Sequence, residues 1–132
     1  MKPASRYGLV GIGALGTLSL VHWARKARYD GPDMANYLIG VLPNVAAAIA
    51  IPFVLLSIWA DQKPDSGFAA ARHVWMRLMV AAGIVLIGWE LIQQSSRALV
   101  FDPHDIGATV IGLALGHVLF LALAPRREAR ER

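Results

Sequence analysis

The sequence has no cysteine and carries little charge. Without cysteine the chain can form no disulfide bond, thiolate metal site or cysteine nucleophile. Charged residues make up 17% of the 132 residues and apolar residues 56%, whereas a soluble domain has a charged fraction of about 25%. The composition therefore indicates an integral membrane protein, in which apolar helices pack together inside lipid.

Common catalytic and nucleotide-binding motifs are also missing. The sequence has no glycine-rich loop ending in Lys-Ser or Lys-Thr, no HExxH and no GxSxG. The four histidines, at positions 22, 73, 104 and 117, lack the spacing of metal ligands. The net charge is +4, but the basic residues form no face with interleaved aromatic residues. We therefore expect no cofactor, no metal and no nucleic-acid partner.

The sequence does contain four long apolar segments. They predict transmembrane helices at about 8–24, 38–60, 75–96 and 105–124 within a single domain, 1–132. The segments are continuous rather than alternating, and an open sheet cannot span lipid, so the predicted fold class is all-α. Short loops predict antiparallel neighbours in a bundle of four helices, with both termini on the same side of the membrane.

Basic residues predict how this bundle is oriented. No A-x-A cleavage site follows the first apolar run, so we expect that run to be a retained helix rather than a signal peptide. The side with both termini would carry Lys2, Arg6, Lys63, Arg72, Arg77, Arg126, Arg127, Arg130 and Arg132, and the other side Arg25, Lys26, Arg28 and Arg97. The larger group favours cytoplasmic termini, whereas the run 25–28 argues for the opposite orientation.

Polar side chains at membrane depth gather toward the outer end of the predicted bundle. In the third helix, positions 90, 93, 94 and 97 share one face because they are spaced i, i+3, i+4 and i+7. An ionisable residue inside the membrane is costly and normally faces the bundle interior, so Glu90 is a candidate functional residue. The candidate ligand-binding residues are Glu90, Gln93, Arg97, Asp105, Asn44 and Thr109.

Several of these residues also have structural explanations. Asp102 followed by Pro103 predicts a helix N-cap, and Asp105 is either an acid of the first helical turn or a site residue. Arg97 fits an anchor at the membrane surface. Gln93 and Gln94 fit hydrogen bonds between helices, and this interpretation is preferred for Gln94.

Other residues are predicted to serve packing. Asn44 either belongs to the site or repairs a helix break at Pro43. His117 is predicted to be a packed histidine. Gly112 and Gly116 form a GxxxG motif, which favours close packing against a helix of this chain or of a second copy. Tryptophans near helix ends fit aromatic belts at the membrane surfaces: Trp23, Trp59, Trp75 and Trp89.

The stretch 90–116 also follows a longer pattern. It consists of E-x-x-Q at a helix end, an arginine, and D-x-x-x-N-x-x-G-x-x-x-G at the next helix start, matched by Glu90, Gln93, Arg97, Asp105, Gly112 and Gly116. Thr109 stands where the pattern has asparagine. In this pattern the chain resembles the VanZ-like family of small bacterial membrane proteins. The resemblance implies the inner (cytoplasmic) membrane, the bacterial cell envelope and a link to glycopeptide antibiotic resistance, but no reaction.

These observations leave three hypotheses for function. In the first, an outward-facing polar pocket binds a membrane lipid headgroup or an envelope lipid precursor, with Arg97 on a phosphate. In the second, the polar residues only hold the third and fourth helices together, and a membrane protein partner or a second copy docks at Gly112 and Gly116. In the third, Glu90 forms an acid/base pair with His22 or Asp105 in an intramembrane enzyme, or the chain is a transporter. We prefer the first.

Overall fold

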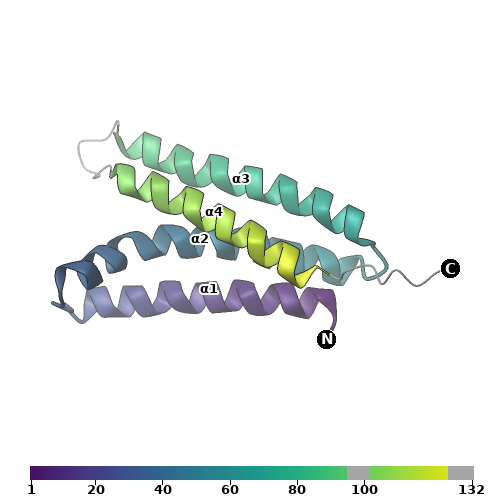
Figure 1. The fold of residues 1–132 in the computed structure, drawn as a ribbon, viewed down its shortest axis with the longest axis horizontal. Helices are drawn as coiled ribbons and strands as arrows, with labels where there is room; N and C mark the ends of the chain where they lie inside the picture. The colour runs from purple at the N-terminus through teal and green to yellow at the C-terminus, as the bar shows by residue number, and fades with distance from the viewer. Residues whose placement is uncertain (95–101, 125–132) are drawn as a thin grey trace.

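The computed structural model describes residues 1–94 and 102–124, which form four helices and no strand (Figure 1). The helices are α1 (Pro3–Lys26), α2 (Asp33–Gln62), α3 (Phe68–Gln94) and α4 (Pro103–Leu123). All four are long and apolar enough to cross a membrane. The predicted all-α fold with four membrane-spanning helices is therefore confirmed, and the chain is a multi-pass membrane protein.

Successive helices run in opposite directions, as the short loops predict (Figure 1). The start of α1 and the end of α4 lie at one end of the molecule, which we call the terminal end. The end of α3 and the start of α4 lie at the opposite, distal end, together with the connection between α1 and α2. The candidate site residues Glu90 and Asp105 therefore belong to the distal end.

Each helix begins before the predicted span. The helices start at Pro3, Asp33, Phe68 and Pro103 instead of at about 8, 38, 75 and 105. Hydropathy detects only the part that lies in hydrocarbon, whereas the helical backbone, which satisfies its own hydrogen bonds, continues through polar turns at the membrane surface. The predicted end of the third helix at 96 lies outside the described residues.

Helix α2 is the central element, since it contacts each of the other three helices, while the backbones of α1 and α3 do not come close within the described residues. Small residues bring α1 close to α2. A Cβ atom added to Gly11 would lie 2.7 Å from Cγ2 of Val54. The hydroxyl of Ser57 donates a hydrogen bond to the carbonyl of Ala4 over 2.9 Å. This is the packing by small residues that membrane helices use in place of a hydrophobic driving force.

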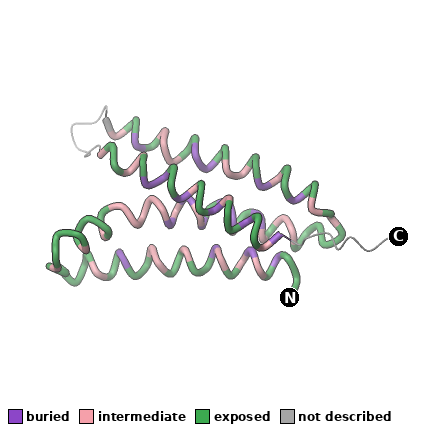
Figure 2. The backbone as a smooth tube through the Cα atoms, viewed as in Figure 1, coloured by how far each residue is buried: buried purple, intermediate pink, exposed green. Residues whose placement is uncertain are grey.

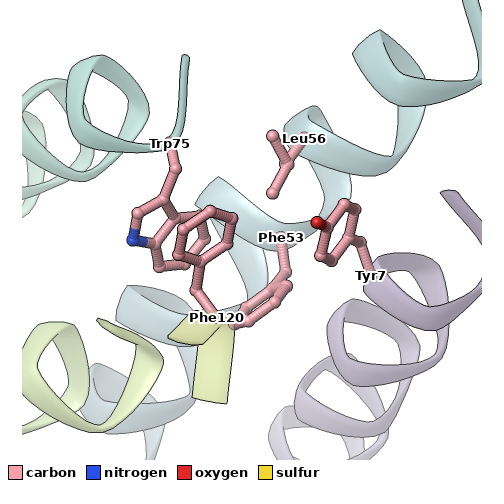
Figure 3. Close-up of a cluster of buried hydrophobic side chains, with 5 residues drawn as sticks. All are labelled: Tyr7, Phe53, Leu56, Trp75 and Phe120. Carbon is pink, nitrogen blue, oxygen red and sulfur yellow. The ribbon is translucent and has the colours of Figure 1, made fainter. Parts of the chain in front are cut away.

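A cluster of aromatic residues forms the core of the terminal half. All four helices contribute to it, through Tyr7, Phe53, Leu56, Trp75 and Phe120 (Figure 3). The rings of Trp75 and Phe120 stack with their centroids 4.9 Å apart, and those of Phe53 and Trp75 are 4.6 Å apart. Close ring packing of this kind holds the bundle together at the end opposite the candidate site.

The prediction that Trp75 belongs to an aromatic belt is wrong, because its side chain is fully buried. Helix α3 begins at Phe68, so Trp75 lies about two turns inside it. Its indole Nε1–H donates to Nδ1 of His117 over 3.2 Å, and the packed histidine predicted at 117 is confirmed. Trp23 and Trp89 are 66% and 55% exposed and agree with the belt prediction.

The outer surface of the bundle is apolar. Figure 2 shows buried residues on the inward sides of the helices and exposed residues around the outside. Ile12, Ile84 and Val118 are each more than 60% exposed, at 65%, 68% and 63%. Exposed aliphatic side chains of this size suit contact with lipid tails.

Helix α2 continues through Pro43, although proline has no N–H to give to the carbonyl four residues earlier, that of Ile39. Arg25, in the last turn of α1, supplies the missing donor. Its Nη2 donates to the carbonyl oxygens of Ile39 over 2.8 Å and of Gly40 over 3.0 Å. The repair predicted for Asn44 is therefore made by an arginine from the neighbouring helix.

Candidate functional site

Glu90 and Thr109 are the two buried polar side chains of the described residues. They are 5% and 1% exposed. Oε2 of Glu90 and Oγ1 of Thr109 have no hydrogen-bond partner within the described part of the chain. A buried polar oxygen left unpaired costs about 1–3 kcal/mol, and more when it is charged. A hydrogen-bond donor placed next to either oxygen would therefore stabilise the folded protein.

The antiparallel packing of α3 and α4 brings Glu90 to the first turn of α4. The register is set deeper in the bundle, where Trp75 stacks on Phe120 and a Cβ on Gly83 would lie 3.1 Å from Leu113. The same register continues toward the distal end and places Glu90 beside Asp105. The Asp105 carboxyl is close enough to act electrostatically on the Glu90 carboxyl. Thr109 lies one turn farther along the same face of α4 as Asp105.

The immediate neighbours of Glu90 are acceptors and one amide. The half-buried side chain of Gln93, one turn farther along α3, is the amide neighbour of the Glu90 carboxyl. This contact joins two residues of α3 and does not link α3 to α4. Asp102 is a second, weaker negative neighbour. Glu90 thus has two carboxyl groups, those of Asp105 and Asp102, within electrostatic range, although the three do not converge on one point. No basic side chain forms an ion pair with Glu90 within the described residues.

Asp102 is the N-cap of α4, as predicted. Its Oδ1 accepts a hydrogen bond from the backbone N–H of His104 over 2.9 Å and lies 2.7 Å from Nδ1 of the same residue. The backbone hydrogen bond first, and the ring second, hold the pKa of Asp102 below its usual value. Because Asp102 fills the cap, Asp105 is free to act in the cluster, although it also lies in the first turn, where the helix dipole favours an acid.

The remaining candidate residues lie at different places. Asn44 is half-buried on α2, one turn before Ala48, which packs against Gly112. Helices α2 and α4 run in the same direction (Figure 1), so Asn44 lies at about the level of Thr109. Arg97 lies outside the described residues.

The GxxxG motif packs inside the chain. A Cβ on Gly112 would lie 2.7 Å from the carbonyl oxygen of Val45 and 2.8 Å from Cβ of Ala48. A Cβ on Gly116 would meet the ring of Trp75 at 3.7 Å. The sequence left open whether this motif packs against a helix of the same chain or of a second copy. In the structure it packs against α2 of the same chain. This face is therefore covered and not available to a second copy.

The sequence analysis missed an apolar groove between α2 and α4. It has a volume of about 490 Å³ and includes Leu38, Val45, Gly107 and Ile111 in its lining. At its distal end the rings of Tyr37 and His104 meet edge to face, with centroids 5.8 Å apart. Gly107, which has no side chain to fill the space, was the sequence signal for this groove.

No protein-family model matches the chain, and no curated protein or solved structure is matched by it. The resemblance to the VanZ-like family remains a prediction, and function has to be argued from the site itself. No group of three or more His, Asp or Glu side chains in the described residues could hold a metal ion. The carboxyls of Glu90 and Asp105 and the hydroxyl of Thr109 can offer hydrogen bonds and negative charge.

Proposed function

We propose that this protein is a VanZ-like protein of the bacterial inner membrane that binds a lipid headgroup or an envelope lipid precursor around Glu90. The observation that carries the proposal is that buried oxygens of Glu90 and Thr109 have no partner among the described residues. Buried polar groups in native proteins are nearly always hydrogen-bonded, so two such exceptions on facing helices need an explanation. A headgroup with hydrogen-bond donors would pair with both.

The same atoms argue against a purely structural network. A network that holds α3 to α4 would pair its buried groups across the two helices. Instead, Oε2 of Glu90 and Oγ1 of Thr109 have no partner among the described residues, and the nearest acid on α4, Asp105, is of the same charge type. When both carboxyls are ionised they repel each other, so the cluster is better suited to a ligand than to helix association.

The groove between α2 and α4 supports a lipid as the ligand. His104 lines the groove and Asp105 belongs to the acidic cluster, so the groove and the cluster lie at the same level, that of the first turn of α4. The groove is lined mainly by aliphatic residues, which suit an acyl chain. A lipid could place its chain in the groove and its headgroup at the acidic cluster.

Cytoplasmic termini would give the site access to envelope lipids. With cytoplasmic termini, as the larger group of basic residues favours, the distal end would face the outer leaflet. The link to glycopeptide resistance rests on the resemblance in residues 90–116. Envelope precursors reach the outer leaflet, so a headgroup site there is compatible with such a role.

Native mass spectrometry of protein extracted gently from its own membrane tests the proposal. We expect a defined lipid or precursor on the wild type, and its loss from Glu90→Ala, because the variant removes the central acceptor. Asp61→Ala is the control, since Asp61 is an exposed acid at the terminal end of α2. Identical lipid profiles for the wild type and Glu90→Ala would refute lipid binding at this site.

A further inference from the structure

The charges around Glu90 indicate which class of headgroup the site takes. We infer that the ligand presents a protonated primary amine to Glu90 and Asp105, as an aminated lipid headgroup does. The inference rests on the proposed function and specifies its ligand. It goes beyond the polar pocket predicted from the sequence, in which a phosphate was expected on Arg97.

Charge is the first argument. Glu90 has Asp105 as its stronger and Asp102 as its weaker electrostatic neighbour. Among the described residues, Arg25 reaches between helices at this end, and it is already bonded to two carbonyl groups of α2. An anionic group would add a further negative charge to this cluster, whereas an ammonium group would be attracted by all three carboxyls.

Hydrogen bonding is the second argument. The unpaired atoms are Oε2 of Glu90, which as a carboxylate only accepts, and Oγ1 of Thr109, which can accept. A primary ammonium has three donors and no acceptor, so one nitrogen could serve Glu90, Asp105 and Thr109 together. A quaternary ammonium has the charge but no N–H, and it is normally held by aromatic rings. None of these three side chains is aromatic.

Other cations fit less well. A divalent metal ion would need a group of three or more acidic or histidine ligands, and the described residues contain none. A proton shared between Glu90 and Asp105 would also relieve their repulsion, but it would leave Oγ1 of Thr109 without a partner. A shared proton would also give the site no preference among lipid headgroups, whereas an ammonium ligand would. A comparison of headgroups therefore distinguishes the proton from the amine.

The test is a lipid titration of delipidated protein, followed by native mass spectrometry. Three lipids with identical acyl chains differ only in the headgroup: phosphatidylethanolamine has a charged amine with N–H donors, phosphatidylcholine has a charged nitrogen without donors, and phosphatidylglycerol has hydroxyl donors without a positive charge. We expect phosphatidylethanolamine to bind the wild type about tenfold more tightly than phosphatidylglycerol, a difference of about 1.4 kcal/mol, with phosphatidylcholine between them. Glu90→Gln should abolish this preference, and the control Asp61→Asn should retain it.

The outcomes separate this inference from the proposed function. If the wild type binds phosphatidylglycerol as well as or better than phosphatidylethanolamine, and Glu90→Ala still loses its lipid, the amine is refuted and the headgroup site stands. If no lipid binds in a manner that depends on Glu90, both fail. Should Glu90→Gln not fold, the order of the three headgroups on the wild type decides alone.

Discussion

Arg25 and Pro43 form a pair of residues whose roles depend on each other. Pro43 removes the helical donor to the carbonyl of Ile39, and Arg25 replaces it from the neighbouring helix over 2.8 Å. The sequence shows the proline and the arginine, which are 18 residues apart (43 − 25), but not that they meet. A carbonyl without a donor is costly inside a membrane, so the pair ties the end of α1 to the start of α2.

We predict that Arg25→Ala destabilises the protein by about 1–2 kcal/mol, because a hydrogen bond from a charged donor to the Ile39 carbonyl is lost. In a Pro43→Ala background the backbone amide of residue 43 can serve that carbonyl, and the cost of Arg25→Ala should fall to less than half. A double-mutant cycle of unfolding free energies in detergent measures the coupling. Lys26→Ala is the control, and strictly additive effects would contradict the pairing.

For single residues, predictions that depend only on neighbouring positions in the sequence are confirmed at Asp102 and Glu90. The cap at Asp102 is confirmed because an N-cap acid followed by proline is determined within one turn of chain. The burial of Glu90 also follows from its place in an apolar helix. Trp75 was misplaced because its environment depends on Phe53 and Phe120 of other helices, and no neighbouring position in the sequence reveals those contacts.

At the scale of elements, α4 is organised by a face of small residues. Ala108, Gly112 and Gly116 are buried and spaced four residues apart, so they form a smooth strip against which α2 packs. The motif predicted close packing from sequence, but it could not name the partner helix, since the same strip suits a second copy equally well. Hydropathy likewise predicted the number of helices and not their ends, because it does not detect interfacial turns.

We predict that Gly112→Ala destabilises the bundle by about 1–3 kcal/mol, the usual cost of overpacking. Its added Cβ would lie 2.7 Å from the backbone oxygen of Val45, which cannot move aside as a side chain can. Gly107→Ala is the matched control, because a Cβ there meets nothing within 4 Å, and alanine favours the helix. Thermal unfolding of both variants in one detergent provides the measurement, and equal melting temperatures would contradict the close approach of α2 and α4.

At the scale of the whole molecule, the packed core and the candidate site lie at opposite ends. The terminal half holds the aromatic core from all four helices, and the distal half holds the acidic cluster with its unpaired oxygens. Proteins commonly retain unfavourable polar groups where function needs them and compensate with packing elsewhere. The position of the polar residues at one end was predictable from the sequence and the topology. The sequence could not predict which of their atoms lack partners, because that depends on how α3 packs against α4.

The central claim is that Glu90 is retained for a ligand and not to hold helices together. The most direct test is the melting temperature of delipidated Glu90→Gln beside delipidated wild type, with Asp61→Asn as the control. Without lipid, we predict a melting temperature equal to or higher than that of the wild type, because the variant removes the repulsion between Glu90 and Asp105. A clearly lower melting temperature for Glu90→Gln alone would show that the carboxylate stabilises the bundle itself, and would contradict the account.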